Sequence, residues 1–298
     1  MIELGSRPQR TLARRTSVTG TAFLTGLPAC VVFEPAPEDT GIVFERADLP
    51  GRPRIPAHVA HVVSTDRCTA LGHGPAQVML VEHILAALAG LHLDNCVVVL
   101  HGPEPPGLDG SAYGFVQALQ AGGVVLQKAM RPIWGVVEPI VLSEDGRSLA
   151  FYPDRERLRI TYYLDYGAFR PPGQHRHTLV CTPEHFVREV ARSRTFLLAE
   201  EVQPLRQRGW GTSLTAADVV VFDRRGVVAN RLRWADEPAR HKILDLVGDL
   251  ALAGLELRGH VVGCRSGHRL NVALARRLRE ALPSARPSAA AVPLPAAA

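Results

Sequence analysis

The chain has 298 residues, of which 46% are hydrophobic, and its 34 basic and 29 acidic residues give a net charge of +5. This composition excludes disorder over most of the chain and can form one large or two ordinary domains. No apolar run approaches the roughly 20 residues of a membrane-spanning helix, and none follows the basic N-terminal residues, so we expect a cytoplasmic protein without stable membrane insertion.

Charge and cysteine content narrow the class of partner and of metal site. The net positive charge suits an anionic partner, but the basic residues are spread among acids without interleaved aromatic side chains. We therefore expect no nucleic-acid binding. The five cysteines are far apart and form no Cys-x-x-Cys pair, which argues against disulfides and thiolate zinc sites and favours buried free thiols.

The predicted elements alternate between strands and helices along the chain. ACVVFEP (29–35) and GIVFERA (41–47) read as strands, VEHILAALAG (81–90) as a helix, and the β-branched run after it as another strand. In the second half LRITYYLDY (158–166) reads as a strand and RHKILDLVGD (240–249) as a helix. Glycine-containing turns, DGS (109–111) and SGH (266–268), each precede a further helical pattern.

The two halves share an internal repeat. ALAGLHLDNCVV (87–98) and ALAGLELRGHVV (251–262) match in order. Each places a strand after a helix that ends at a glycine, Gly90 or Gly254, and we expect both glycines to form αL caps. We infer two copies of one α/β unit joined near 127–131, so that the domains are 1–128 and 129–282. Residues 283–298 have no periodicity and little to bury, which predicts a disordered tail.

A possible metal site follows from the helix at 240–249. His241, Asp245 and Asp249 recur every fourth residue, so they share one side of this helix, and His83 has a similar position in the first copy. If the two copies face each other, His83, His241 and Asp245 form a set of nitrogen and oxygen ligands that suits zinc. Three protein ligands leave one position for water, as in catalytic zinc sites.

The neighbouring residues could serve hydrolysis. Glu82, beside a proposed ligand, is the candidate base, and His268 is the candidate acid, with Asp249 able to stabilise its protonated form. From the residues alone, a catalytic metal site and a purely structural role both stay open. A His-x-x-x-Asp pair is commonly a local helix contact, and a Ser-Gly-His sequence commonly serves only to form a turn.

Five motifs together resemble one enzyme family. VEHILAALAGLHLDN, GPEPPGLDGSAYGFV, ARSRTF, RHKILDLVGDL and SGHRLN occur in the order and spacing of the UDP-3-O-acyl-N-acetylglucosamine deacetylases, zinc enzymes of lipid A synthesis in Gram-negative bacteria. The resemblance covers roughly residues 10 to 282. It implies an α+β fold of two similar α/β domains, each a small sheet layered with helices, with the site between them. It also implies removal of the N-acetyl group of UDP-3-O-(3-hydroxyacyl)-N-acetylglucosamine, with release of acetate.

The resemblance implies the same metal ligands, base and acid, and adds substrate contacts. Thr195 would hydrogen-bond the acetyl carbonyl as it becomes an oxyanion, and Phe196 and Lys242 would contact substrate. Lys242 and Arg265 could meet the diphosphate of the UDP-linked acylated glucosamine. An insert around 200–215 would form a passage for the acyl chain. Iron(II) would also suit the ligands, and we expect a monomer.

Three segments depart from the family pattern, and two alternative functions therefore stay open. Leu24 stands where the family has a histidine, 164–169 lacks an expected His-Pro, and 209–221 lacks paired glycines and an Asn-Ala. None of these departures removes a proposed metal ligand, base or acid, so they affect the expected substrate contacts and acyl passage more than catalysis. A related zinc amidase acting on another acylated sugar nucleotide would tolerate them, and a non-catalytic metal-binding module is the third hypothesis.

Overall fold

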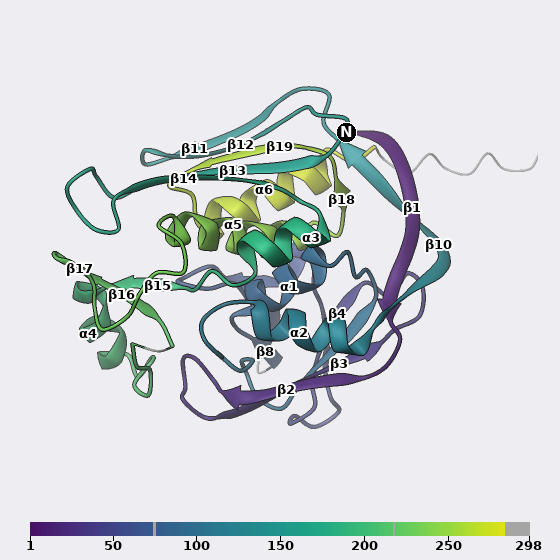
Figure 1. Cartoon of the computed structure of the whole chain (residues 1–298). Helices are drawn as coiled ribbons and strands as arrows, with labels where there is room; N and C mark the ends of the chain where they lie inside the picture. Colours follow the sequence, from purple (N-terminus) through teal and green to yellow (C-terminus); the bar gives the residue numbers. More distant parts are fainter. Residues whose placement is uncertain (74–75, 217, 284–298) are drawn as a thin grey trace, which may run out of the picture.

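The computed structural model describes residues 1–73, 76–216 and 218–283. Figure 1 shows two sheets on opposite sides of the molecule, with two layers of helices between them. The fold is α+β and consists of two similar layered halves, as the sequence predicts.

The first half is a five-stranded sheet with helices on its inner face (Figure 1). The sheet order is β2 (Thr16–Thr21), β3 (Pro28–Pro35), β9 (Cys96–Leu100), β4 (Ile42–Arg46) and β5 (Arg54–Pro56). The helices are α1 (Val81–Gly90) and α2 (Tyr113–Gly122), and a small sheet joins β6 (Val62–Ser64), β7 (Ala70–His73) and β8 (Ala76–Val78), after the 3-10 turn η1 (Val59–His61). The central strand β9 reads CVVVL, has strands on both edges and is buried throughout. Every second residue joins the main core, while Val97 and Val99 pack with Val32 in a small separate cluster.

The second half repeats this arrangement. Its sheet order is β11 (Ile140–Glu144), β12 (Arg147–Tyr152), β19 (Gly259–Cys264), β13 (Leu158–Asp165) and β14 (Gln174–Val180). In both sheets the central strand is antiparallel to one neighbour and parallel to the other. The helices are α5 (Glu237–Ala251), α6 (His268–Glu280) and α3 (Pro183–His185), which continues into the π-helical turn η2 (Phe186–Val190). The predicted repeat of one α/β unit therefore matches the topology.

A long ribbon and an excursion complete the chain. β1 (Ile2–Leu12) pairs antiparallel with β10 (Val124–Gly135), and β18 (Glu256–Leu257) adds to the end of β10. Residues 127–131, the predicted domain boundary, lie inside β10, so a continuous strand passes through it and the boundary stays a prediction. β15 (Phe196–Leu198), α4 (Ala199–Gln207), β16 (Val220–Asp223) and β17 (Gly226–Val227) project at one side (Figure 1).

The two glycines of the ALAGL repeat have different conformations. Gly254 has φ +65°, as an αL cap requires, whereas Gly90 is the last helical residue of α1. A Cβ at Gly90 would lie 2.3 Å from Cδ1 of Phe186. The αL prediction is therefore wrong for Gly90, which instead permits close packing of an aromatic ring.

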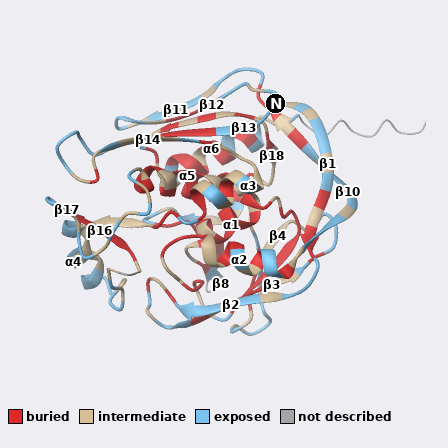
Figure 2. Ribbon diagram, viewed as in Figure 1, coloured by how far each residue is buried: buried red, intermediate tan, exposed pale blue. Residues whose placement is uncertain are grey.

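One core runs through both halves. A single apolar cluster contains Phe33 and Phe115 of the first half and Phe151 and Phe186 of the second. Figure 2 shows α1 and α5, the helices at the centre, as largely buried. α5 packs against α1 with its polar side, so its line of His241, Asp245 and Asp249 is buried and not a solvated face.

The remaining sequence expectations concern thiols, the membrane and the tail. All five cysteines are free, but only Cys68 and Cys96 are buried, and the other three are half-buried. No helix in the described part of the chain is long and apolar enough to cross a bilayer. The predicted tail 283–298 lies, except for Pro283, outside the described residues.

Candidate active site

A cavity of about 440 Å³ opens beside the contact between α1 and α5. Its wall includes all but two of the residues predicted for the site: Glu82, His83, Thr195, Phe196, His241, Lys242, Asp245 and His268. Asp249 lies behind His268, and Arg265 is not part of the described wall. The structure thus brings residues from both halves into one cavity.

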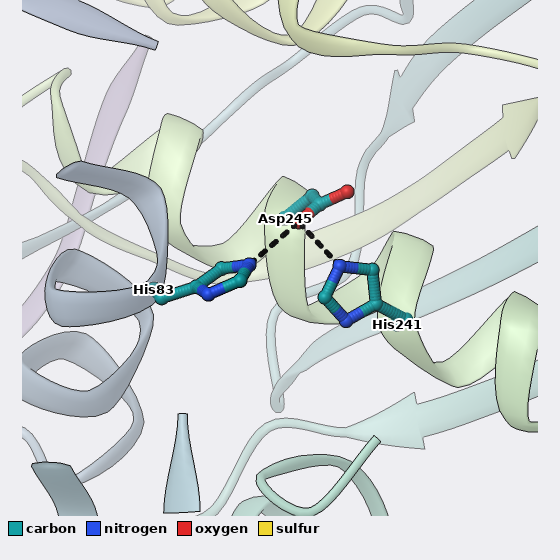
Figure 3. Close-up of side chains that lie close together, drawn as sticks. All are labelled: His83, His241 and Asp245. Atoms are coloured by element: carbon teal, nitrogen blue, oxygen red, sulfur yellow. Dashed lines mark ion pairs between the residues drawn. The ribbon is translucent and has the colours of Figure 1, made fainter. Parts of the chain in front are cut away.

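His83, His241 and Asp245 line this cavity. Their side chains point toward one another (Figure 3). His83 extends from α1 and the other two from α5, where they are one helical turn apart. Oδ1 of Asp245 lies 3.3 Å from Nε2 of His241 and 3.7 Å from Nε2 of His83. One potential ligand atom from each residue lies within 4.8 Å of the others, so the three could bind a single ion.

The protonation states of this group suit a metal. Nδ1 of His241 lies 3.0 Å from the carbonyl oxygen of Ser193, which can only accept, so Nδ1 carries the proton and Nε2 keeps its lone pair. Burial lowers the pKa of His241 to about 4. Burial alone would raise the pKa of Asp245, but its interactions with the His241 ring and the Lys242 ammonium hold it well below its usual range. A neutral imidazole and a carboxylate are the forms that bind metal.

Glu82 follows the first residue of α1 and is only 2% exposed. Burial raises the pKa of its carboxyl, and the nearby rings of His268 and His83 oppose this rise. Its Oε2 accepts a hydrogen bond of 3.0 Å from the backbone N–H of Thr69. A carboxyl with a raised pKa, at the cavity wall and beside His83, is suited to accept a proton.

His268, the last residue of the predicted turn, begins α6, and its Nδ1 lies 2.9 Å from Oδ2 of Asp249. Burial alone would lower the pKa of His268, but the Asp249 carboxylate more than offsets this and raises it to about 9. Asp249 is fully buried and also accepts hydrogen bonds from Thr69 Oγ1 (2.6 Å) and Asn271 Nδ2 (2.9 Å). His268 is therefore cationic at neutral pH and can donate a proton.

Thr195 lines the cavity from a segment that a buried ion pair fixes in place. Arg194 donates to Glu237, the first residue of α5, from Nε (2.8 Å) and Nη2 (3.0 Å). The backbone of Thr195 donates to the carbonyl of Gly110 in the DGS turn (2.8 Å). In that turn Asp109 accepts from Ser111, as expected for a structural aspartate, and also binds Arg233 of the second half.

The substrate contacts predicted around Phe196 lie together, with one exception. The Lys242 ammonium lies 5.6 Å from the centre of the Phe196 ring and 2.9 Å from Oδ2 of Asp245. Arg147 and Arg269, which the sequence did not single out, also line the cavity. Arg265 is exposed and its charge lies near Asp165.

The cavity has an apolar end beneath the predicted insert. Leu197, Val202, Leu205, Trp210 and Leu214 line it from the insert side, and Phe23, Leu24 and Phe115 line it from the first half. The backbone N–H of Gly211 donates to the carbonyl of Leu24 (2.8 Å), so the insert is attached to the loop that carries this departure. Leu24, where the resemblance leads us to expect a histidine, adds an apolar side chain to the cavity wall.

Sequence reasoning missed the groups that support these side chains. Thr69, Ser193 and Asn271 lie outside the repeat pattern and meet the site only through folding. Arg194 belongs to the ARSRTF motif, but an arginine beside a threonine does not indicate that its buried partner is Glu237, 43 residues away.

The fold and the cavity define a hydrolase with a candidate metal centre between two similar halves. The family model LpxC, UDP-3-O-acyl N-acetylglycosamine deacetylase, matches residues 9–280. The UDP-3-O-acyl-N-acetylglucosamine deacetylase of Chlamydia caviae is 40% identical over 277 residues, which cover 93% of this chain and 98% of the relative. That of Thermosynechococcus vestitus is 40% identical over 272 residues, covering 91% and 94%. The chain belongs to the UDP-3-O-acyl N-acetylglycosamine deacetylase family.

Proposed function

We propose that this protein hydrolyses the N-acetyl group of UDP-3-O-(3-hydroxyacyl)-N-acetylglucosamine, in the cytoplasm of a Gram-negative bacterium, as a step of lipid A synthesis. The observation that carries the proposal is the convergence of Glu82, His268 and the group His83, His241 and Asp245 on one cavity. The family relationship supports the substrate.

His83, His241 and Asp245 would hold a zinc ion, and two nitrogens and one oxygen also suit iron(II). The donor set fits a divalent cation because Nδ1 of His241 is already engaged and Asp245 is ionised. Such a metal supplies Lewis acidity, which polarises the acetyl carbonyl and lowers the pKa of water.

The side chains then perform the proton transfers. Glu82 accepts a proton from the attacking water, while the Thr195 hydroxyl donates a hydrogen bond to the carbonyl oxygen as negative charge develops. A C–O bond forms to the acetyl carbon and the C–N bond breaks. His268 gives its proton to the leaving glucosamine nitrogen, which departs as the amine. The acetic acid that remains loses the second proton of the water to solvent and leaves as acetate, and transfer of the proton from Glu82 to His268 through solvent restores both groups.

The rest of the cavity would select the substrate. Lys242, Arg147 and Arg269 offer cationic partners for the diphosphate, and the apolar end under the insert would hold the 3-hydroxyacyl chain. We propose Phe196 as a contact for the sugar beside Lys242. The exposed position of Arg265 makes it the weakest of the proposed substrate contacts.

The experiment is acetate release from this substrate by zinc-loaded and metal-stripped protein, with Glu82→Gln as the matched variant. We expect release only with metal, and loss of release in Glu82→Gln while its metal content equals that of the wild type. Release from another acylated amino-sugar nucleotide only would favour the related amidase. No release from a folded, metal-loaded protein with any of these substrates would overturn the proposal.

A further inference from the structure

Thr69 connects the two proton-transfer groups of the site although it lies outside the described cavity wall. It is fully buried and immediately precedes β7. Its backbone N–H donates to Oε2 of Glu82 (3.0 Å), and its hydroxyl donates to Oδ1 of Asp249 (2.6 Å), 180 residues further along the chain. One residue of the first half is thus bonded both to the candidate base and to the partner of the candidate acid.

The backbone of Thr69 is fixed on both sides. Its carbonyl oxygen accepts a hydrogen bond from the N–H of Val81, the first residue of α1 (3.2 Å). Its own N–H donates to the carboxylate of Glu82, the second residue of that helix. The hydroxyl therefore projects from a rigid position at the beginning of the helix that carries the base.

The hydroxyl in turn determines how the Asp249 carboxylate is rotated. A carboxylate only accepts, so Thr69 must be the donor to Oδ1. Oδ2 then faces both the His268 imidazole and the Asn271 amide, each at 2.9 Å. Because these donors satisfy both oxygens, Asp249 has one orientation, and His268 is aimed through its Nδ1 bond.

We propose that Thr69 is a positioning residue that sets the placement of the His268 acid relative to the Glu82 base across the two halves. The inference rests on the proposed function, which gives Glu82 and His268 their roles. Without the hydroxyl, the carboxylate can rotate and His268 loses its alignment with the leaving nitrogen, while substrate binding is unaffected because Thr69 does not touch the cavity.

Thr69→Val tests this, because valine has nearly the same shape and keeps the backbone bond to Glu82. We expect kcat to fall about tenfold to a hundredfold, the loss typical of one hydrogen bond to a buried charge. KM should stay within about twofold and metal content should be unchanged. Thr69→Ser restores the hydroxyl, and its kcat should be within about threefold of wild type. Thr69→Ala provides the same comparison if valine prevents folding.

Thr11→Val is the matched control, since Thr11 is buried and its hydroxyl bonds Asn95 O (2.7 Å) and Ala36 N (3.0 Å) away from the site. It should lose stability but keep kcat. Wild-type kcat in a hydroxyl-free variant, or a serine variant as slow as the valine one, would overturn the inference. Glu82→Gln, run in parallel, separates this result from failure of the proposed function, which would show as undiminished release by that variant.

Discussion

The carbonyl oxygen of Glu82 lies 2.0 Å from the point that a Cβ at Gly248 would occupy. α5 can approach α1 this closely only because residue 248 has no side chain. The separation between the residues that α1 contributes, Glu82 and His83, and those that α5 contributes, His241 and Asp245, therefore depends on this glycine.

We predict that Gly248→Ala forces the helices apart. The added methyl group meets backbone, which cannot move aside, so unfolding free energy should fall by about 1–3 kcal/mol and acetate release should fall with it. Urea denaturation and the release assay measure the two effects. Gly114→Ala in α2 is the control, since its Cβ would meet only the Leu108 side chain, nearest at Cδ1 (2.6 Å), which can shift. Equal stability and activity in Gly248→Ala would contradict this account of the helix contact.

The His268–Asp249 pair should make stability depend on pH. The folded-state pKa of His268, about 9, lies above its ordinary value of 6.5, so the pair stabilises the fold fully below about pH 6.5 and less as the pH rises through about 9. The shift corresponds to on the order of 3 kcal/mol. Denaturation of metal-free protein at about pH 6 and about pH 9 should show this loss. If His268→Gln shows the same loss, another group is responsible.

Catalysis should follow the same group on the alkaline side. An acid with a pKa of about 9 is protonated at neutral pH. We therefore expect kcat to decline as the pH rises through about 9 and His268 loses its proton. His268→Gln should be slow and lack this alkaline decline, which a pH–rate profile would show.

The buried Arg194–Glu237 pair should be a major contributor to the order of the Thr195 segment. Its side chains are 6% and 1% exposed, so Arg194→Met leaves an uncompensated carboxylate and should cost about 3–5 kcal/mol. Backbone N–H groups of Arg194 and Arg233 still donate to Glu237, which places the loss toward the lower limit. Adding Glu237→Leu should recover part of the stability. A double variant no better than the single one would argue that the ion pair is not the cause.

The apolar end of the cavity should control acyl-chain length. Leu205→Trp fills space under the insert, so KM for a substrate with a long 3-hydroxyacyl chain should rise about tenfold, while a short-chain substrate should change less than about twofold. Steady-state kinetics with both substrates measures the difference. Val137→Trp, at a side chain that is 63% exposed and outside the described wall, is the control. Equal effects on both chain lengths would place the acyl chain elsewhere.

Periodicity and repetition predicted the fold well, because they record burial. The ALAGL repeat marks corresponding helix-to-strand passages into β9 and β19, the central strands of the two sheets. The repeat also drew attention from His241 to His83, although the two are not in register, because His83 lies four residues before its ALAGL copy and His241 ten. They meet because α1 and α5 pack together. The four-residue spacing placed Asp245 and Asp249 on the same side of α5 as His241, and this is the side that packs against α1.

Contacts between unrelated segments left no trace in the pattern. The hydroxyl of Thr69 meets Asp249 only because folding places the residue before β7 beside α5, and no local rule distinguishes this threonine from others. The sequence suggested that Gly90 is a helix cap. In the structure it must be glycine because the ring of Phe186, nearly a hundred residues later, leaves no room for a side chain. Arginines along the chain likewise gave no indication that Arg147 and Arg269 reach the cavity while Arg265 does not.

The ribbon of β1 and β10 has a consequence for how the site is assembled. Its antiparallel register runs from Ile2 opposite Gly135 to Leu12 opposite Val124, and β10 leads directly from one layered half to the other. His83 therefore meets His241 and Asp245 at an effective concentration fixed by the chain itself, and not by encounters between molecules. Specific activity should accordingly stay constant on dilution, where a site shared between separate subunits would come apart.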